Sequence, residues 1–131
     1  MKTVLFICQA NVGRSQMAEG FYNYLTNSKL AKSAGVEDFA EKYKYHPTAE
    51  IIESMAEKGI DISKQRIKVL TPGVCKTAKR IVVLCKKELC PHYLLSDPKT
   101  IFCEVNDPFE KEKGVVNKVR DEIETIVKGL L

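Results

Sequence analysis

Segments typical of strands alternate with segments typical of helices along the chain. The sequence predicts strands at five short stretches, which are residues 3–7, 31–35, 67–70, 81–84 and 100–105. Four helices are expected. The first begins at Ser15, the second follows Pro47 and stops near Gly59, the third is short and starts at Thr71 and Pro72, and the last spans residues 114–129. Strands that alternate with helices form βαβ units. The expected fold class is therefore α/β, with a parallel sheet covered by helices on both faces.

Each longer helix is expected to bury one apolar face. Residues three and four positions apart lie on the same side of a helix, so apolar residues at that spacing predict which side is buried. These residues are Met17, Phe21, Tyr24 and Leu25 in the first helix, Ile51, Ile52 and Met55 in the second, and Val116, Val119, Ile123, Ile126 and Leu130 in the last. Residues 36–46 are polar and are expected to form a loop.

Length and composition predict one globular domain over residues 1–131. The chain is 44% hydrophobic and 29% charged, as is usual for a compact protein. Its net charge of +4 is small and its lysines are dispersed, which argues against a nucleic-acid partner. The apolar runs are too short to span a membrane, and no signal peptide is visible. We therefore expect a cytoplasmic protein, and we expect it to be a monomer.

The stretch from Cys8 to Ser15 carries the strongest indication of chemistry. It reads Cys-Gln-Ala-Asn-Val-Gly-Arg-Ser and lies between the first strand and the first helix. Ligands of parallel sheets bind at the carboxyl ends of the strands, where backbone N–H groups and a helix N-terminus can surround an anion. The sequence therefore predicts a tetrahedral oxyanion held by Gln9, Ala10, Asn11, Val12, Gly13, Arg14 and Ser15.

Cys8 is the expected nucleophile at this site. The positive surroundings favour its thiolate form, and the Ser15 hydroxyl is expected to donate to the sulfur. Arg14 supplies a planar guanidinium that matches two oxygens of the anion. Asn11 is expected to adopt a positive φ that holds the loop open. A cysteine and an arginine separated by five residues occur often by chance, so the position of this pair between a strand and a helix carries the interpretation.

Asp107 is the best candidate for a general acid. Transfer of a phosphoryl group to a cysteine requires an acid that protonates the leaving oxygen. Asp107 and Pro108 follow the last predicted strand, whose carboxyl end opens towards the same side as Cys8. Without the Cys8 loop, a turn with no chemical role would be the favoured interpretation.

These motifs resemble those of the low-molecular-weight protein tyrosine phosphatase superfamily, which includes the thioredoxin-coupled arsenate reductases. The resemblance covers nearly the whole chain and rests on residues 8–15, 16–21, 33–35, 59–63 and 107–108. It implies a three-layer fold with a four-stranded parallel sheet, Cys8 as nucleophile, Arg14 as oxyanion clamp and Asp107 as general acid.

The resemblance also bears on cofactors. It implies that none is required, although Asn11, Glu19, Ser33 and Asp61 match positions that bind potassium in some reductases. Four oxygen-bearing side chains suit such a hard cation. Glu19 and Asp61 are equally well explained as solvated charges.

Two further cysteines favour the reductase branch. Cys85 follows a predicted buried strand and Cys90 precedes Pro91, and this pair resembles the resolving cysteines of the reductases. The resemblance implies that Cys85 attacks the Cys8 adduct, arsenite leaves, Cys90 takes over the disulfide, and thioredoxin reduces it. Packing alone is the alternative for Cys85, and Cys75 and Cys103 are assigned to packing.

Hydrolysis of protein phosphotyrosine or phosphoarginine is the alternative function. Three aromatic residues of the loop, Phe39, Tyr43 and Tyr45, would stack on a substrate ring, and arsenate has no ring. Phe109 directly after Asp107 and Pro108 also resembles the sequence of the phosphatases. Capping of the core edge explains these rings equally well.

Two other interpretations are weaker. A zinc site of Cys75, Cys85, Cys90 and His92 fits no usual spacing, and a non-hydrolytic phosphoryl carrier is disfavoured by Arg14 and Asp107.

Overall fold

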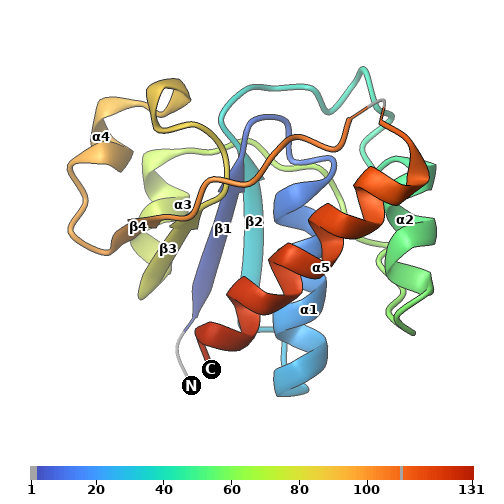
Figure 1. Cartoon of the computed structure of the whole chain (residues 1–131). Coiled ribbons are helices and arrows are strands. Elements are labelled where there is room, and N and C mark those ends of the chain that lie inside the picture. The colour runs from blue at the N-terminus through green and yellow to red at the C-terminus, as the bar shows by residue number, and fades with distance from the viewer. Residues whose placement is uncertain (1–2, 110) are drawn as a thin grey trace.

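A computed structural model of the chain describes residues 3–109 and 111–131, and it has the expected α/β architecture (Figure 1). Within these residues the sheet has four strands, β1 (Val4–Cys8), β2 (Ala31–Gly35), β3 (Arg80–Val83) and β4 (Thr100–Phe102). All pairings are parallel, and the strand order is β2-β1-β3-β4. Cys8 therefore ends an interior strand, with β2 on one side and β3 on the other.

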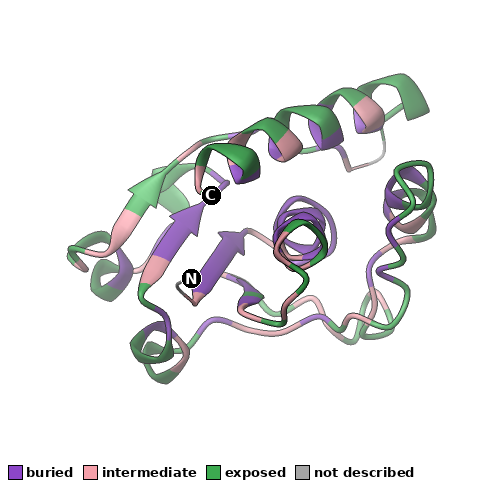
Figure 2. Cartoon of the chain, turned by 90° about the horizontal axis from the view of Figure 1, so that it is seen from below, coloured by how far each residue is buried: buried purple, intermediate pink, exposed green. Residues whose placement is uncertain are grey.

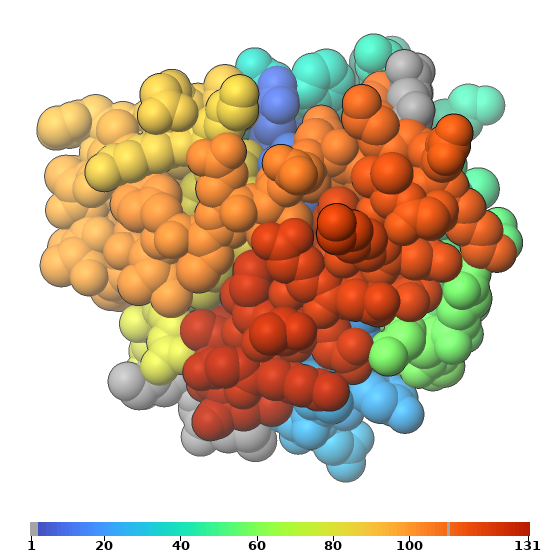
Figure 3. Space-filling model, viewed as in Figure 1, coloured from blue at the N-terminus to red at the C-terminus, as the bar shows by residue number. Residues whose placement is uncertain are grey.

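Helices cover both faces of the sheet, so the predicted three-layer arrangement is confirmed (Figures 1 and 2). On one face lie α1 (Arg14–Thr26), α2 (Ala49–Ala56) and α5 (Lys113–Gly129), and on the other lie α3 (Pro72–Thr77) and α4 (His92–Leu95). A short 3-10 helix, η1 (Lys87–Leu89), precedes α4. In the space-filling view α5 forms much of one face of the molecule (Figure 3). Val4 and Phe6 of β1 pack into one layer and Leu5 and Ile7 into the other, as expected for a strand covered on both sides.

The predicted face of α1 is correct at its start and wrong at its end. Met17 and Phe21 are buried, whereas Tyr24 is 59% exposed and Leu25 is 38% exposed. Burial in α1 depends on position along the helix. Its first turns pack beneath the Cys8 loop and against Ile62, and its last turn extends past this packing. Helical spacing alone contains no information on where such packing stops.

Two predicted strands are shorter in the structure. Residues 67–70 form a single bridge, between Val69 and Gly35, because β2 ends at Gly35 and offers no further partner. The strand predicted at 100–105 ends at Phe102. Hydrogen bonds from Cys103 N to Val83 O (2.8 Å) and from Val105 N to Leu84 O (2.9 Å) nevertheless keep the following residues beside β3.

The helix predicted after Pro47 begins at Ala49 and ends at Ala56, and Gly59 follows with a φ of +77°. Among the described residues, no helix is both long enough and apolar enough to cross a membrane.

Candidate active site

Cys8 receives hydrogen bonds from the loop that follows it. Asn11 adopts the predicted positive φ of 59°, which turns its backbone N–H towards the Cys8 Sγ at 3.3 Å. The Ser15 Oγ lies 2.9 Å from the same sulfur. Because the Asn11 Nδ2 donates to the Ser15 Oγ at 2.6 Å, the hydroxyl proton of Ser15 is free to point at Cys8. Two donors therefore converge on the Cys8 sulfur.

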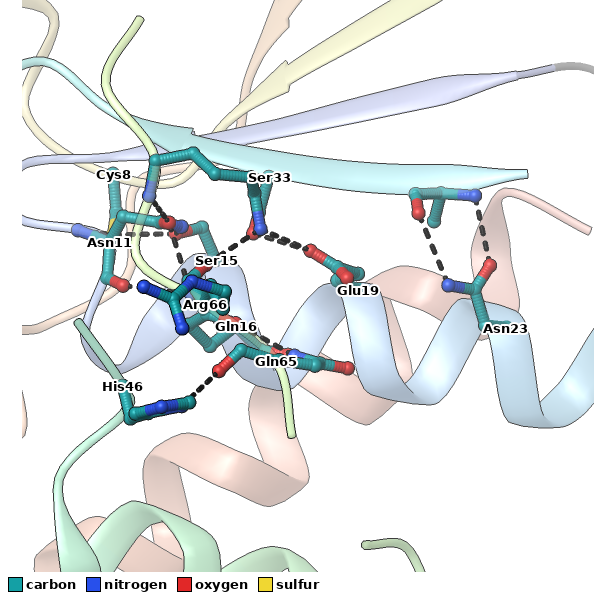
Figure 4. A network of polar contacts seen from close by, with 12 residues as sticks. Cys8, Asn11, Ser15, Gln16, Glu19, Asn23, Ser33, His46, Gln65 and Arg66 are labelled. Atoms are coloured by element: carbon teal, nitrogen blue, oxygen red, sulfur yellow. Dashed lines mark hydrogen bonds and ion pairs between the residues drawn. The ribbon is translucent and has the colours of Figure 1, made fainter. Parts of the chain in front are cut away.

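A buried polar network holds Asn11 in place (Figure 4). The Asn11 Oδ1 accepts from the Gln16 Nε2 at 3.0 Å and from the Lys68 N at 2.9 Å. The Gln65 Nε2 in turn donates to the Gln16 Oε1 at 2.7 Å, and His46 Nδ1 lies 2.9 Å from the Gln65 O. The sequence indicated Gln16 only as part of the resemblance, and it gave no indication of Gln65 or Lys68. The hydrogen-bond partners of Gln65 and Lys68 lie about fifty residues away along the chain, so no local pattern connects them.

The loop also lies directly against the end of β2. A Cβ at Gly35 would lie 2.9 Å from the Ala10 carbonyl carbon and 3.0 Å from the Asn11 N, so a side chain there would collide with the loop backbone. The parallel pairing of Cys8 with Gly35 brings the two segments together. Glycine is thus required by the close approach of two backbones.

Arg14 connects the loop to the segment that carries Asp107. Its Nη1 donates to the Val105 O at 3.0 Å, and its Nη2 lies 3.9 Å from the Asp107 Oδ2. The Arg14 side chain is 7% exposed and that of Asp107 is 55% exposed. Phe109 N donates to the Asp107 Oδ1 at 3.0 Å, which fixes the carboxylate in a turn. The predicted nucleophile, clamp and acid therefore surround one space.

That space is a cavity of about 210 Å³. Its floor contains Cys8 and five of the seven predicted oxyanion-binding residues, namely Gln9, Ala10, Val12, Gly13 and Arg14. The other two, Asn11 and Ser15, are fully buried and support the floor through the hydrogen bonds described above.

Aromatic rings form a wall of the cavity. Phe39, Tyr43 and Phe109 line it, and the rings of Tyr43 and Phe109 meet edge to face with their centroids 5.5 Å apart. Lys42 also lines the cavity, with its Nζ 5.5 Å from the centre of the Tyr43 ring. Tyr45 packs elsewhere, against the Arg66 guanidinium. The predicted aromatic loop therefore supplies two of its three rings to the site.

Cys85 and Cys90 lie on the α3–α4 side of the sheet, in the same apolar cluster as Cys8. Leu84 N donates to the Ile7 O at 2.7 Å, which places Cys85 next to the end of β1. Burial raises the pKa of the Cys85 thiol to about 12, the neighbouring Cys90 and Cys8 sulfurs add to the rise, and Arg14 opposes it. Burial also raises the pKa of Cys90, although a hydrogen bond with Cys85 opposes this. Cys85 thus has Cys8 and Cys90 as neighbours.

The other two cysteines have different surroundings. All five cysteines are free thiols. Cys75 belongs to the same apolar cluster, and burial raises its pKa. Cys103 packs on the opposite face of the sheet, against the cluster that includes α1 and α5. Within residues 3–109 and 111–131, no group of three or more His, Cys, Asp or Glu residues is arranged to hold a metal ion, so a zinc site is not supported.

The four residues expected to bind potassium do not fit that ion. The Asn11 Oδ1 already accepts two hydrogen bonds, which occupy both of its lone pairs. Asp61 is exposed and accepts from the Ser63 N at 2.8 Å. Glu19 accepts from the Ser33 Oγ at 2.6 Å and is paired with the Lys68 Nζ at 3.3 Å. The Lys68 ammonium group therefore lies against Glu19, where a potassium ion would have to bind.

Comparisons with known proteins agree with this geometry. A family model described as low molecular weight phosphotyrosine protein phosphatase matches residues 3–131. An arsenate reductase of Brevibacillus brevis is 35% identical over 130 residues, which cover 97% of this chain and 92% of that protein. Among solved structures, the tyrosine phosphatase amsI of Erwinia amylovora superposes with a TM-score of 0.86 at 21% identity, covering 98% of this chain and 90% of that one. The YwlE arginine phosphatase of Geobacillus stearothermophilus gives 0.81 at 22% identity, covering 99% and 90%.

Proposed function

Because the chain belongs to the low molecular weight phosphotyrosine protein phosphatase family, we propose that it attacks a tetrahedral oxyanion with Cys8 and that this anion is arsenate. The observation that carries the proposal is the position of Cys85, which is buried beside Cys8 and has the Cys90 thiol as its other neighbour. A hydrolase needs no such thiols. The similarity to arsenate reductases over nearly the full chain supports the same assignment.

The reaction has three thiol steps. The Cys8 thiolate attacks arsenic, and one arsenate oxygen leaves as water after protonation by Asp107. The Cys85 sulfur then attacks the Cys8 sulfur and loses its proton. The electron pair of the sulfur–arsenic bond stays with arsenic, so arsenate is reduced to arsenite and a Cys8–Cys85 disulfide forms. Cys90 next attacks Cys85, which releases Cys8 and leaves a Cys85–Cys90 disulfide.

A dithiol protein must reduce the final disulfide, and we propose thioredoxin as this reductant. Cys90 is the more exposed of the pair, at 9% against 1% for Cys85. It also belongs to the short segment between η1 and α4, so its sulfur is the one that an external thiol can reach with least rearrangement. Free thiols at all five cysteines suit a reducing compartment, which supports a cytoplasmic location as part of the proposal.

Phosphatase activity is the second candidate, and the aromatic wall favours it. Phe39, Tyr43 and Phe109 line the cavity above Cys8, and arsenate has no group that would use them. A phosphotyrosine ring would stack against such rings, and hydrolysis requires only Cys8, Arg14, Asp107 and water.

The decisive experiment compares both reactions in cysteine variants. Arsenate-dependent oxidation of NADPH is measured with thioredoxin and thioredoxin reductase, and aryl phosphate hydrolysis is measured in parallel. Cys85→Ser and Cys90→Ser are expected to lose NADPH oxidation by at least about 100-fold, because hydroxyls form no disulfides, and to keep hydrolysis. Cys75→Ser is the matched control, since Cys75 is a buried thiol of the same cluster, and it should keep both activities.

Mass spectrometry after one turnover without reductant identifies the intermediates. The wild type should contain a Cys85–Cys90 disulfide, and Cys90→Ser should stop with Cys8 joined to Cys85. Efficient phosphotyrosine hydrolysis by a wild type that oxidises no NADPH with arsenate would reject the reductase assignment and leave the phosphatase.

A further inference from the structure

Glu19 is a poorly solvated carboxylate with a protein cation beside it. Its side chain is 13% exposed, and its Oε1 accepts from the Ser33 Oγ at 2.6 Å. The Lys68 Nζ lies 3.3 Å from the same oxygen and donates to the Arg66 O at 2.8 Å. A carboxylate and a backbone carbonyl are the ligand types that hard cations prefer in proteins. Here an ammonium group occupies that position.

Lys68 also reaches the active-site loop through its backbone. Its N–H donates to the Asn11 Oδ1 at 2.9 Å, and the Asn11 Nδ2 donates to the Ser15 Oγ, which contacts the Cys8 Sγ. The segment that carries Lys68 is further tied to β2, since Gly35 N donates to the Lys68 O at 2.8 Å. Lys68 therefore connects the Glu19–Ser33 pair to Asn11, whose side chain orients the Ser15 hydroxyl beside Cys8.

We propose that Lys68 is a built-in cation that replaces a monovalent metal ion at Glu19 and fixes the position of Asn11. A carboxylate that is largely removed from water requires a counter-charge, and the Lys68 ammonium supplies it permanently. Lys68 touches no reacting atom, so it is a positioning residue. The protein therefore works without potassium, and removal of the ammonium creates a potassium requirement. This inference concerns the loop itself and holds for either reaction of Cys8.

The test replaces the ammonium and supplies the ion from solution. Melting temperature and aryl phosphate hydrolysis are measured in potassium chloride and in tetramethylammonium chloride at equal ionic strength. The wild type should give the same values in both salts. Lys68→Met keeps the length of the side chain without its charge, and 40% exposure of the Lys68 side chain leaves the position open to solvent. This variant should melt about 3 °C higher in potassium than in tetramethylammonium, and the rise should saturate with potassium concentration.

The kinetic constants distinguish positioning from a purely structural role. In tetramethylammonium, Lys68→Met should lose several-fold in kcat with little change in KM, because Asn11 and Ser15 support Cys8 without lining the cavity. Potassium should restore kcat, and Lys68→Arg should keep it in both salts. Lys32→Met, which removes an exposed lysine of β2, is the control and should show no salt difference.

Three results would overturn the proposal. A saturable potassium response of the wild type would show that an ion binds despite Lys68, and this arm needs no variant to fold. A Lys68→Met protein whose melting temperature and activity do not change with potassium would show that the ammonium group does not compensate the charge of Glu19. A melting response without any change in kcat would remove the positioning role.

Discussion

Cys85 shows how a single residue can be set apart by its surroundings. It is 1% exposed and follows β3, and burial raises its pKa to about 12. A thiol with this pKa stays protonated at neutral pH. It is therefore protected from alkylation and oxidation until a partner sulfur is presented to it. The proposed relay thus keeps its second thiol inactive between turnovers.

The same pKa predicts a loss of stability in alkali. The folded protein holds the Cys85 proton more tightly than the unfolded chain does. The contribution of this thiol to stability is therefore complete below pH 9, the ordinary thiol pKa, and is lost as the pH rises towards 12. The free energy of unfolding should fall by up to about 1.4 kcal/mol per pH unit within this window.

Urea unfolding at a series of pH values in the presence of reductant measures this slope. Cys85→Ala should make the slope shallower and leave the part due to Cys75 and Cys90. Cys103→Ala, on the other face of the sheet, should leave the slope as in the wild type. Identical slopes in the wild type and Cys85→Ala would contradict the assignment.

At the scale of elements, the contact between the end of β2 and the Cys8 loop shows what a sequence can and cannot reveal. Residues 31–35 and the loop were both predicted, because each has a local signal. The close approach of Gly35 to Ala10 was not, since it arises only when two strands pair in register. The same limit explains why Lys68 and Gln65 were missed and why 67–70 was predicted as a full strand.

Gly35→Ala tests this contact. The added Cβ would collide with the loop backbone, so we expect at least about a tenfold loss of kcat/KM for aryl phosphate and a destabilisation of about 1–3 kcal/mol. Gly114→Ala is the matched control, because a Cβ at Gly114 meets nothing within 4 Å and lies in a helix that alanine favours. Full activity in Gly35→Ala would show that the loop tolerates displacement.

At the scale of the whole molecule, the parallel sheet gathers the site from distant segments. Cys8 ends β1, whereas Cys85 follows β3 and Asp107 follows β4, and the three meet at one edge because parallel strands end on the same side. This is why the alternation of elements in the sequence was enough to predict a parallel α/β fold, whereas the candidate site depended on the motif from Cys8 to Ser15. The aromatic wall was only partly predictable, since a loop without periodicity does not indicate which of its rings turns inward.

Oxyanion binding should stabilise the whole fold even without the nucleophile. In Cys8→Ser the donors of the loop remain, so inorganic phosphate at about 100 times its dissociation constant should add about 2.7 kcal/mol to the free energy of unfolding. Urea unfolding with and without phosphate measures this gain. Adding Arg14→Met to Cys8→Ser should remove most of it, since Arg14 lines the cavity. Equal stabilisation of both proteins would place the phosphate elsewhere.

The two faces of the sheet divide the groups around Cys8. Cys85 and Cys90 belong to the layer of α3 and α4, whereas Arg14 begins α1 and Asp107 lies on the segment that leads to α5. The thiol pair and the Arg14–Asp107 pair are therefore carried by different elements, although both adjoin Cys8. If the proposed relay is correct, its two thiols can be gained or lost on one side of the sheet by substitutions outside the elements that carry Arg14 and Asp107. The two proposed chemistries would then share one nucleophile and differ in the layer of the sheet that supplies its partner groups.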